Sequence, residues 1–275
     1  MALSFFLLTL AFTQAINGIH HAGSSTGIKQ LLNDSESTVG GIPFATRAYW
    51  MRKANQALPD LGSPCPWAAF GSVVVNHTTA EELGDLICSG VNENLKSGNP
   101  VSHGEIAAIT NCTDILTNKD GRFKLTSLEA LEAFKGFTLY TNAESCPMCA
   151  AAIRWAGFKE YVYGTSMETL IRMGWPQIRI SSREVFEHST DLPSSSNIIG
   201  GILMNETDPY FAWQFDPSSS CPRGCDRPRA GRNCRRSERR PGFCYQKGLT
   251  WMCRVSDVIK SYIIDSGISL KTLVS

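Results

Sequence analysis

The chain has 275 residues, a formal net charge of +1 at pH 7, 43% hydrophobic residues and 19% charged residues. These values are ordinary for a globular protein with a sizeable core, and the near-zero charge argues against a protein that binds nucleic acid through its overall charge. The charge is locally uneven, because nine arginines lie between Arg223 and Arg254 against only two acidic residues, Asp226 and Glu238.

The chain begins with an apolar run, MALSFFLLTLAFTQA, that ends in small and polar residues. Its length suits a signal-peptide core and is too short for a bilayer span, so we expect residues 1–15 to be a signal peptide. No later segment has the roughly 20 apolar residues of a membrane span. Ten cysteines agree with export, and so do four N-x-S/T sequons, which lie at Asn33, Asn76, Asn111 and Asn205. We therefore expect a secreted, disulfide-bonded glycoprotein without a membrane anchor.

Hydrophobic periodicity divides the rest of the chain into a leader, a domain and a tail. Residues 16–42 are rich in Gly, Ser, Asn and Asp and are expected to form a flexible leader. Alternating strands and helices over residues 43–216 predict an α/β layered domain. The expected strands are 67–75, 83–91, 137–141, 160–165 and, as a candidate, 198–204. The expected helices are 44–58, 103–112, 126–134, 146–157, 167–174 and 208–215. Residues 217–275 change to Cys, Pro, Gly and Arg and are expected to form a tail whose first part is held by disulfides.

The stretch ESCPMC, residues 144–149, carries two cysteines three positions apart at the start of a predicted helix, with Pro147 at its first position. This spacing places the sulfurs of Cys146 and Cys149 on one helix face. A helix N-terminus lowers thiol pKa values, which prepares thiolates for a soft cation but serves a redox pair equally well. The motif alone leaves both interpretations open.

A second stretch, NPVSHGEIAAI at residues 99–109, favours the metal. His103 as a third ligand would complete a zinc site with an open fourth position, the arrangement of catalytic zinc. Glu105 would then lie near the metal without binding it. Positions i and i+2 do not share a helix face, so His103 is expected at the irregular edge of the first turn.

His-x-Glu followed by Cys-x-x-Cys is the signature of zinc-dependent nucleobase deaminases. Residues 43–216 resemble the cytidine deaminase-like superfamily, in particular bacterial guanine deaminase, tRNA adenosine deaminase and fungal cytosine deaminase. Five stretches match in family order: AAFGSVVV, SGVN, NPVSHGE, FTLYTNAESCPMCAAAIRWAG and DPYFAWQF. The resemblance implies a three-layer α/β/α fold with a central mixed sheet of about five strands. It also implies Zn2+ held by His103, Cys146 and Cys149.

The same resemblance assigns roles to individual residues. Glu105 would be catalytic, moving a proton from water to the substrate ring and then to the departing ammonia. Asn92, the last residue of SGVN, would contact the base. Aromatic residues could stack on the base, and the family's C-terminal helix often covers the pocket, which favours Trp213 and Phe211. The remaining candidates are Phe70, Trp155 and Trp175.

Two departures from the family pattern bear on the substrate. Ser145 stands where the family has proline, and Gln177 stands where guanine deaminases carry an acidic residue. Gln177 weakens a guanine assignment. The stretch HGE at residues 103–105, with NC at residues 111–112 after the helix, is similar to fungal cytosine deaminase. We therefore expect a small nucleobase or nucleoside of guanine or cytosine type as the substrate.

Three alternatives stay open at this level. A tRNA adenosine deaminase would share the zinc residues and dock phosphates on the arginine-rich tail. A non-catalytic secreted zinc module would keep the site without turnover, and a thiol oxidoreductase would use Cys146 and Cys149. Relatives are commonly dimers, so the resemblance also allows for a homodimer.

Overall fold

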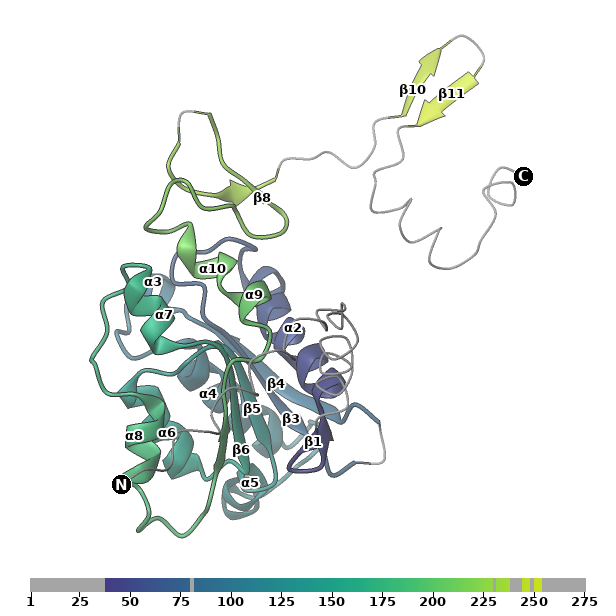
Figure 1. The fold of residues 1–275 in the computed structure, drawn as a ribbon. Helices are drawn as coiled ribbons and strands as arrows, with labels where there is room; N and C mark the ends of the chain where they lie inside the picture. Colours follow the sequence, from purple (N-terminus) through teal and green to yellow (C-terminus); the bar gives the residue numbers. More distant parts are fainter. Residues whose placement is uncertain (1–37, 80–81, 230, 238–243, 248–249, 254–275) are drawn as a thin grey trace, which may run out of the picture.

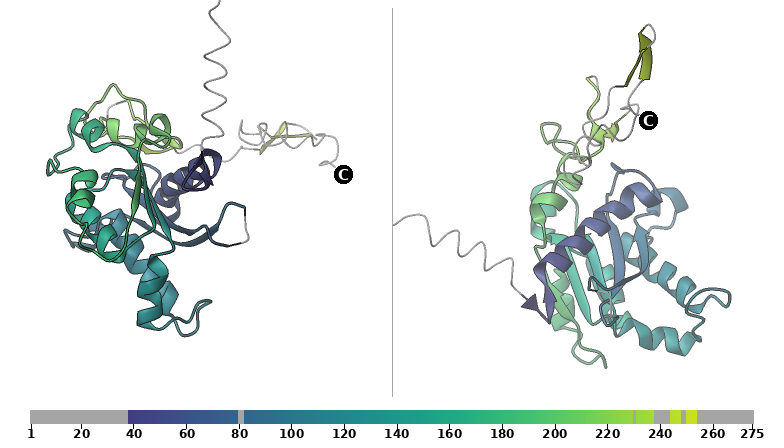
Figure 2. Two further views of the ribbon diagram at one scale, coloured as in Figure 1. Left: turned by 60° about the horizontal axis from the view of Figure 1, so that its bottom comes forward. Right: turned by 90° about the vertical axis from the view of Figure 1, so that its right-hand side faces the viewer.

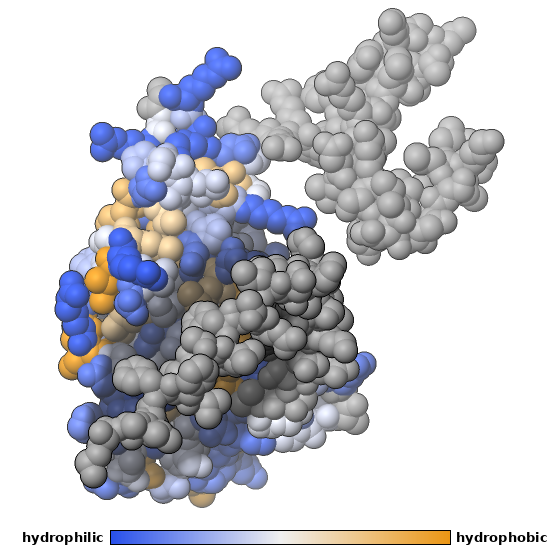
Figure 3. Space-filling view, in the orientation of Figure 1, coloured by the Kyte–Doolittle hydropathy of each residue, from blue (hydrophilic) through white to orange (hydrophobic). Residues whose placement is uncertain are grey.

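The computed structural model describes residues 38–79, 82–229, 231–237, 244–247 and 250–253 (Figure 1). The predicted signal peptide, most of the predicted leader and the sequon at Asn33 lie outside these residues. No helix in the described ranges is long and apolar enough to cross a membrane. The face in Figure 3 is mostly hydrophilic, with a few apolar patches.

A mixed sheet of five strands forms the middle layer of the molecule. The strand order is β4 (Asp85–Val91), β3 (Gly71–Asn76), β5 (Thr138–Ala143), β6 (Glu160–Thr165) and β7 (Asn197–Ile199). β3 is antiparallel to both of its neighbours, whereas β5, β6 and β7 are parallel. All six residues of β5 are buried, as expected for a central strand with both faces covered.

Helices cover both faces of the sheet (Figures 1 and 2). On one face, α4 (Gly104–Thr117), α5 (Ser127–Phe134) and α6 (Pro147–Ala156) enclose a core that includes Leu139 and Tyr161. On the other face, α2 (Phe44–Leu61), α7 (Met167–Arg172) and α10 (Pro209–Ala212) contribute to a second core. The two cores confirm the predicted three-layer α/β/α fold.

Short elements complete the described chain. They comprise α3 (Asn94–Ser97), α8 (Ser182–Glu187), α9 (Met204–Thr207) and the two-residue strands β1 (Thr38–Val39), β2 (Ile42–Pro43), β8 (Cys225–Asp226) and β9 (Arg235–Arg236). β10 (Cys244–Lys247) and β11 (Thr250–Cys253) pair antiparallel.

Two helix starts follow the sequence signals. Thr126 caps α5 in a capping box, because its side chain accepts from the backbone N–H of Glu129 while the Glu129 carboxylate accepts from the N–H of Thr126. α6 begins at Pro147 and ends at Ala156, and its C-cap residue Gly157 is left-handed with φ of 80°.

Three predicted strands were too long, and the one expected at 83–91 begins at Asp85. The strand expected at 67–75 begins only at Gly71, because Ala68 has a φ of 55° and turns the chain away from the sheet. The candidate at 198–204 ends at Ile199, since Gly201 and Leu203 both have positive φ and lead into α9. The short helices α3, α8 and α9 were not predicted.

Three disulfides join distant parts of the described chain. Cys88–Cys112 links β4 to α4, and Cys221–Cys234 closes a loop after α10. Cys65–Cys225 spans 160 positions and links the loop after α2 to the segment that follows the predicted domain. Cys146 and Cys149 remain thiols.

Candidate active site

The starts of two helices bring the predicted metal ligands together. His103 is the N-cap residue of α4 and Cys146 is the N-cap residue of α6, both with extended backbone. The Nδ1 atom of His103 lies 3.6 Å from the Sγ atoms of both Cys146 and Cys149. All three ligand atoms lie within 4.8 Å of one another.

These distances fit a zinc ion. With Zn–S bonds of about 2.3 Å and Zn–N bonds of about 2.0–2.1 Å, nitrogen and sulfur ligands of a tetrahedral site lie about 3.6 Å apart. One imidazole and two thiolates are also a donor set that zinc prefers. The group can therefore hold zinc with three protein ligands.

The electrostatics of the cluster favour a cation. A hydrogen bond from the Cys149 thiol, with a further one from His103, lowers the pKa of Cys146 to about 4. The shared hydrogen bond with Cys146 raises the pKa of Cys149 and also that of His103. Cys146 is consequently a thiolate at neutral pH, and a metal can replace the proton that the group shares.

Glu105 lies in the first turn of α4 and is only 3% exposed. Burial raises the pKa of its carboxyl group, which suits a residue that must both accept and donate a proton. The neighbouring Gly104 lets this turn approach the adjacent chain closely, because a Cβ atom there would lie 2.7 Å from the carbonyl oxygen of Phe70.

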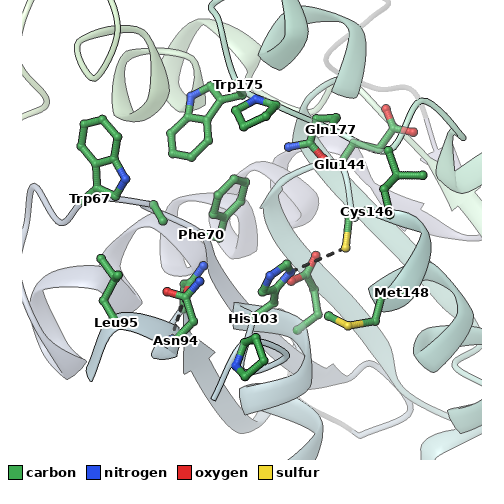
Figure 4. A pocket seen from close by; sticks show the side chains of 16 residues that line it. Trp67, Phe70, Asn94, Leu95, His103, Glu144, Cys146, Met148, Trp175 and Gln177 are labelled. Carbon is green, nitrogen blue, oxygen red and sulfur yellow. Dashed lines mark hydrogen bonds between the residues drawn. The ribbon is translucent and has the colours of Figure 1, made fainter. Parts of the chain in front are cut away.

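A cavity of about 590 Å³ opens above this group (Figure 4). Its size suits a small organic ligand. It is lined by Trp67, Ala68, Phe70, Asn92, Asn94, Leu95, Pro100, His103, Glu105, Glu144, Cys146, Met148, Trp175, Pro176, Gln177 and Ile178. Polar and metal-ligating groups are thus combined with aromatic walls.

Two predicted substrate contacts, Asn92 and Phe70, line the cavity. The Oδ1 atom of Asn92 accepts a hydrogen bond from the backbone N–H of Asn94, which leaves its Nδ2 group as a donor for a ligand. The ring of Phe70 meets that of Trp175 edge to face, with centroids 5.3 Å apart. Asn92 can therefore address the polar edge of a flat ring and Phe70 its apolar surface.

The expectation that Trp213 faces the substrate is corrected. Trp213 is 3% exposed and packs with Cys65, Cys225 and Cys234, because the segment after α10 covers it. Its ring packs against the ring of Trp67, which was not among the predicted contacts and which lines the cavity instead.

The other aromatic candidates lie elsewhere. Phe211 is buried behind Phe70, with ring centroids 5.0 Å apart, and is absent from the cavity lining. Trp155 is 77% exposed and belongs to a separate hollow beside α8.

Asn142 and Glu144, which precede Cys146, hold the chain around the site in place, and neither was predicted. The carboxylate of Glu144 accepts hydrogen bonds from the N–H groups of Met167 and Ser182 and from the Ser182 hydroxyl, which ties α7 and α8 to the end of β5. The amide of Asn142 accepts from Gly71 and donates to the carbonyl of Ala69. The sequence signal available for Asn142 was a polar residue in a strand buried on both faces; Glu144 lies directly after that strand.

Comparisons with known proteins agree with this site. The profile of a family described as "Cytidine and deoxycytidylate deaminase zinc-binding region" matches residues 45–165. Guanine deaminase of Bacillus subtilis (strain 168) is 33% identical over 148 residues, which cover 53% of this chain and 79% of that protein. A probable cytosine deaminase of Schizosaccharomyces pombe is 29% identical over 121 residues, or 42% of this chain and 62% of that protein.

A solved structure from a study of A-to-I editing by tRNA:A34 deaminases is 20% identical, with a TM-score of 0.41, and the match covers 60% of this chain and 98% of the chain in that structure.

The match to the Bacillus protein shows the family, and the His, Cys and Cys group is in place. The chain therefore belongs to the cytidine and deoxycytidylate deaminase zinc-binding family and is a zinc-dependent hydrolytic deaminase.

Proposed function

We propose that this protein deaminates a free nucleobase or its nucleoside, of guanine or cytosine type, and releases ammonia. The observation that carries the proposal is the cavity, in which Glu105 and the metal-ligating group share one space with Asn92 and aromatic walls. A flat heterocycle that enters this space can meet all of these groups at once.

The residues of the chain divide the reaction between them. Zinc, when bound by His103, Cys146 and Cys149, supplies the Lewis acidity that makes water nucleophilic at neutral pH. Glu105 would move one proton from the water to a ring nitrogen, where it stays, and the second proton, from the hydroxyl then on the ring carbon, to the amino group that leaves as ammonia. Asn92 orients the ring through its Nδ2 group.

The charge of the cavity supports an uncharged substrate. None of the described residues that line it is Lys or Arg, the side chains that usually bind phosphate. A nucleoside monophosphate would bring a phosphate that no Lys or Arg side chain of this lining can bind, whereas a base or nucleoside brings none.

Gln177 lines the cavity and bears on the choice of base (Figure 4). Where guanine deaminases carry an acceptor-only carboxylate, this neutral amide offers a donor and an acceptor. It can therefore meet either a ring N–H or a ring carbonyl, and both guanine and cytosine stay within the proposal.

The test is ammonia release from cytosine, guanine, adenine and their nucleosides, together with a tRNA anticodon stem. We expect release from one of the free bases or nucleosides and none from the tRNA stem. Turnover of the tRNA stem alone would favour the tRNA adenosine deaminase alternative, in which the arginines after α10 dock phosphate. Stoichiometric zinc without turnover of any compound would favour the non-catalytic module.

We propose further that the protein is secreted. Three disulfides support this, because they persist mainly in oxidising compartments. Among the described sequons, Asn205 is exposed, whereas the Nδ2 group of Asn111 donates to the carbonyl of Ser89 and is less available for a glycan. Asn76 accepts hydrogen bonds from Thr78 in a local turn.

Expression in a secretory host tests this proposal. We expect protein in the medium that begins near Ile16 and loses mass on treatment with a glycosidase. Recovery from the cytosol with Met1 intact would contradict it.

A further inference from the structure

We propose that Trp67 is a stacking wall for the substrate ring, and that the segment after α10 positions it through the Cys65–Cys225 disulfide. This inference rests on the proposed function, since it needs a flat ring in the cavity. Trp67 lines the cavity and remains 44% exposed (Figure 4). A large apolar ring with that exposure beside a cavity has surface left for a ligand to cover.

Trp67 belongs to a continuous aromatic surface. Its ring centroid lies 6.0 Å from that of Trp175, which in turn lies 5.3 Å from Phe70. All three line the cavity. Two exposed apolar side chains, Leu95 and Ile178, extend this surface at the cavity lining, so a flat uncharged ring finds apolar contacts there.

The backbone on either side of Trp67 is held from the C-terminal part of the chain. The Oε1 atom of Gln214 accepts from the N–H of Ala68 at 2.9 Å, and its Nε2 atom donates to the carbonyl of Pro66 at 3.4 Å. Gln214 is buried, so these bonds are shielded from water. The side-chain amide of one residue thereby fixes both neighbours of Trp67.

The Cys65–Cys225 disulfide adds a covalent anchor at Cys65, the residue directly before Pro66. Cys65 bonds to Cys225, and both are buried with Trp213, on which the Trp67 ring packs edge to face at 6.3 Å. Ala68 holds a left-handed backbone, with φ of 55°, that a residue with a Cβ atom adopts only when its surroundings impose it. The disulfide, the amide bonds and the packing together impose the turn that presents Trp67.

Steady-state kinetics test the stacking role of Trp67. Trp67→Ala should raise KM for the deaminated base about 5- to 100-fold, as expected for loss of one stacking contact, with a smaller change in kcat. Trp67→Phe should recover most of the loss. Trp155→Ala is the matched control, because Trp155 is exposed away from the cavity, and it should behave as wild type.

Removal of the disulfide tests the positioning. The double variant Cys65→Ser, Cys225→Ser should raise KM, whereas Cys221→Ser, Cys234→Ser, which removes the disulfide within the loop, should change it less. In a Trp67→Ala background, loss of Cys65–Cys225 should have little further effect, because it acts through Trp67. Zinc content and a melting curve for every variant identify any that fail to fold.

Hydrogen exchange reports the positioning without turnover. Amides in residues 65–70 should exchange faster when Cys65–Cys225 is removed, while α4 and α6 keep their protection. The positioning role would be overturned if exchange in residues 65–70 did not change. It would also be overturned if Trp67→Ala and removal of Cys65–Cys225 had additive effects on KM. An unchanged KM for Trp67→Ala would overturn the stacking role. If wild type released ammonia from no base or nucleoside, the proposed function and the stacking role would fail together, and exchange alone would decide the positioning.

Discussion

The backbone N–H of Ser145 donates a hydrogen bond to the hydroxyl of Tyr161 at 2.6 Å, directly before the first metal-ligating cysteine. Both residues are buried. The family carries proline at position 145, and proline has no N–H that needs a partner. This chain has Ser145 there, and the hydroxyl of Tyr161 in β6 accepts from its N–H. The bond fixes the backbone that leads into Cys146.

Tyr161→Phe should therefore destabilise the protein by about 1–3 kcal/mol, because it leaves a buried N–H without a partner. It should also weaken zinc binding, since the approach to Cys146 becomes looser. Thermal unfolding and a zinc competition assay measure the two effects. Tyr163→Phe, two positions along the same strand and half-buried, is the control. Equal behaviour of the two variants would contradict the role of the hydroxyl.

Gly104→Ala should impair both stability and turnover. The added Cβ would lie 2.7 Å from the carbonyl oxygen of Phe70, so the start of α4 must shift and carry His103 and Glu105 with it. In Gly136→Ala the new atom has nothing closer than 3.5 Å, an ordinary contact, and we expect little change. Activity and melting temperature of both variants check this; a fully active Gly104→Ala protein would show that the helix start can move without consequence.

The Cys88–Cys112 disulfide should stabilise the fold around the catalytic helix. It joins β4 to α4 across 24 positions, and a loop of that length predicts about 3 kcal/mol of stabilisation through the unfolded chain. Denaturant unfolding of Cys88→Ser, Cys112→Ser should show this loss. A variant with unchanged stability would mean that the disulfide is not formed in the isolated protein.

His77 should make the fold less stable in acid. Burial lowers the pKa of His77, and the charges of Arg47 and Lys159 lower it further, whereas Glu160 and a hydrogen bond with the backbone of Leu83 raise it. A lowered folded-state pKa gives stability that is present above the unfolded value of 6.5 and is lost as pH falls through the folded value.

The matched variant is His77→Gln, which can still bond to the hydroxyl of Tyr140, 2.9 Å from Nε2 in the native protein. Melting temperatures of both proteins from pH 8 to pH 4.5 should diverge below about pH 6.5, with the wild type falling faster. Parallel curves would assign the acid sensitivity to other groups.

That His103, Cys146 and Cys149 lie together was predictable because each one sits at a helix start with its own sequence signal. Pro147 marks the start of α6, and the Cys-x-x-Cys spacing places two sulfurs on one face. The direction of Glu105 was not predictable, since positions i and i+2 diverge on a helix. The structure explains it: His103 is the N-cap with extended backbone and lies outside the helix that contains Glu105.

The wall of the cavity could not be predicted, because it is made by contacts between distant parts of the chain. Pro66 and Ala68 meet Gln214 across nearly 150 positions, and Cys65 meets Cys225 across 160. No local pattern reports such pairings, and disulfide connectivity cannot be read from cysteine spacing. Trp67 consequently looked like the first residue of a strand, and Trp213 like a residue facing the substrate.

The most direct test of a zinc deaminase in which Glu105 moves the proton is to compare zinc content and ammonia release for Glu105→Gln and His103→Ala. Glu105→Gln should keep one zinc per chain and its melting temperature, and lose roughly 10²–10⁴-fold in turnover. His103→Ala should lose zinc and stability, because it removes a metal ligand. Full activity in Glu105→Gln, or loss of zinc equal to that of His103→Ala, would contradict the account.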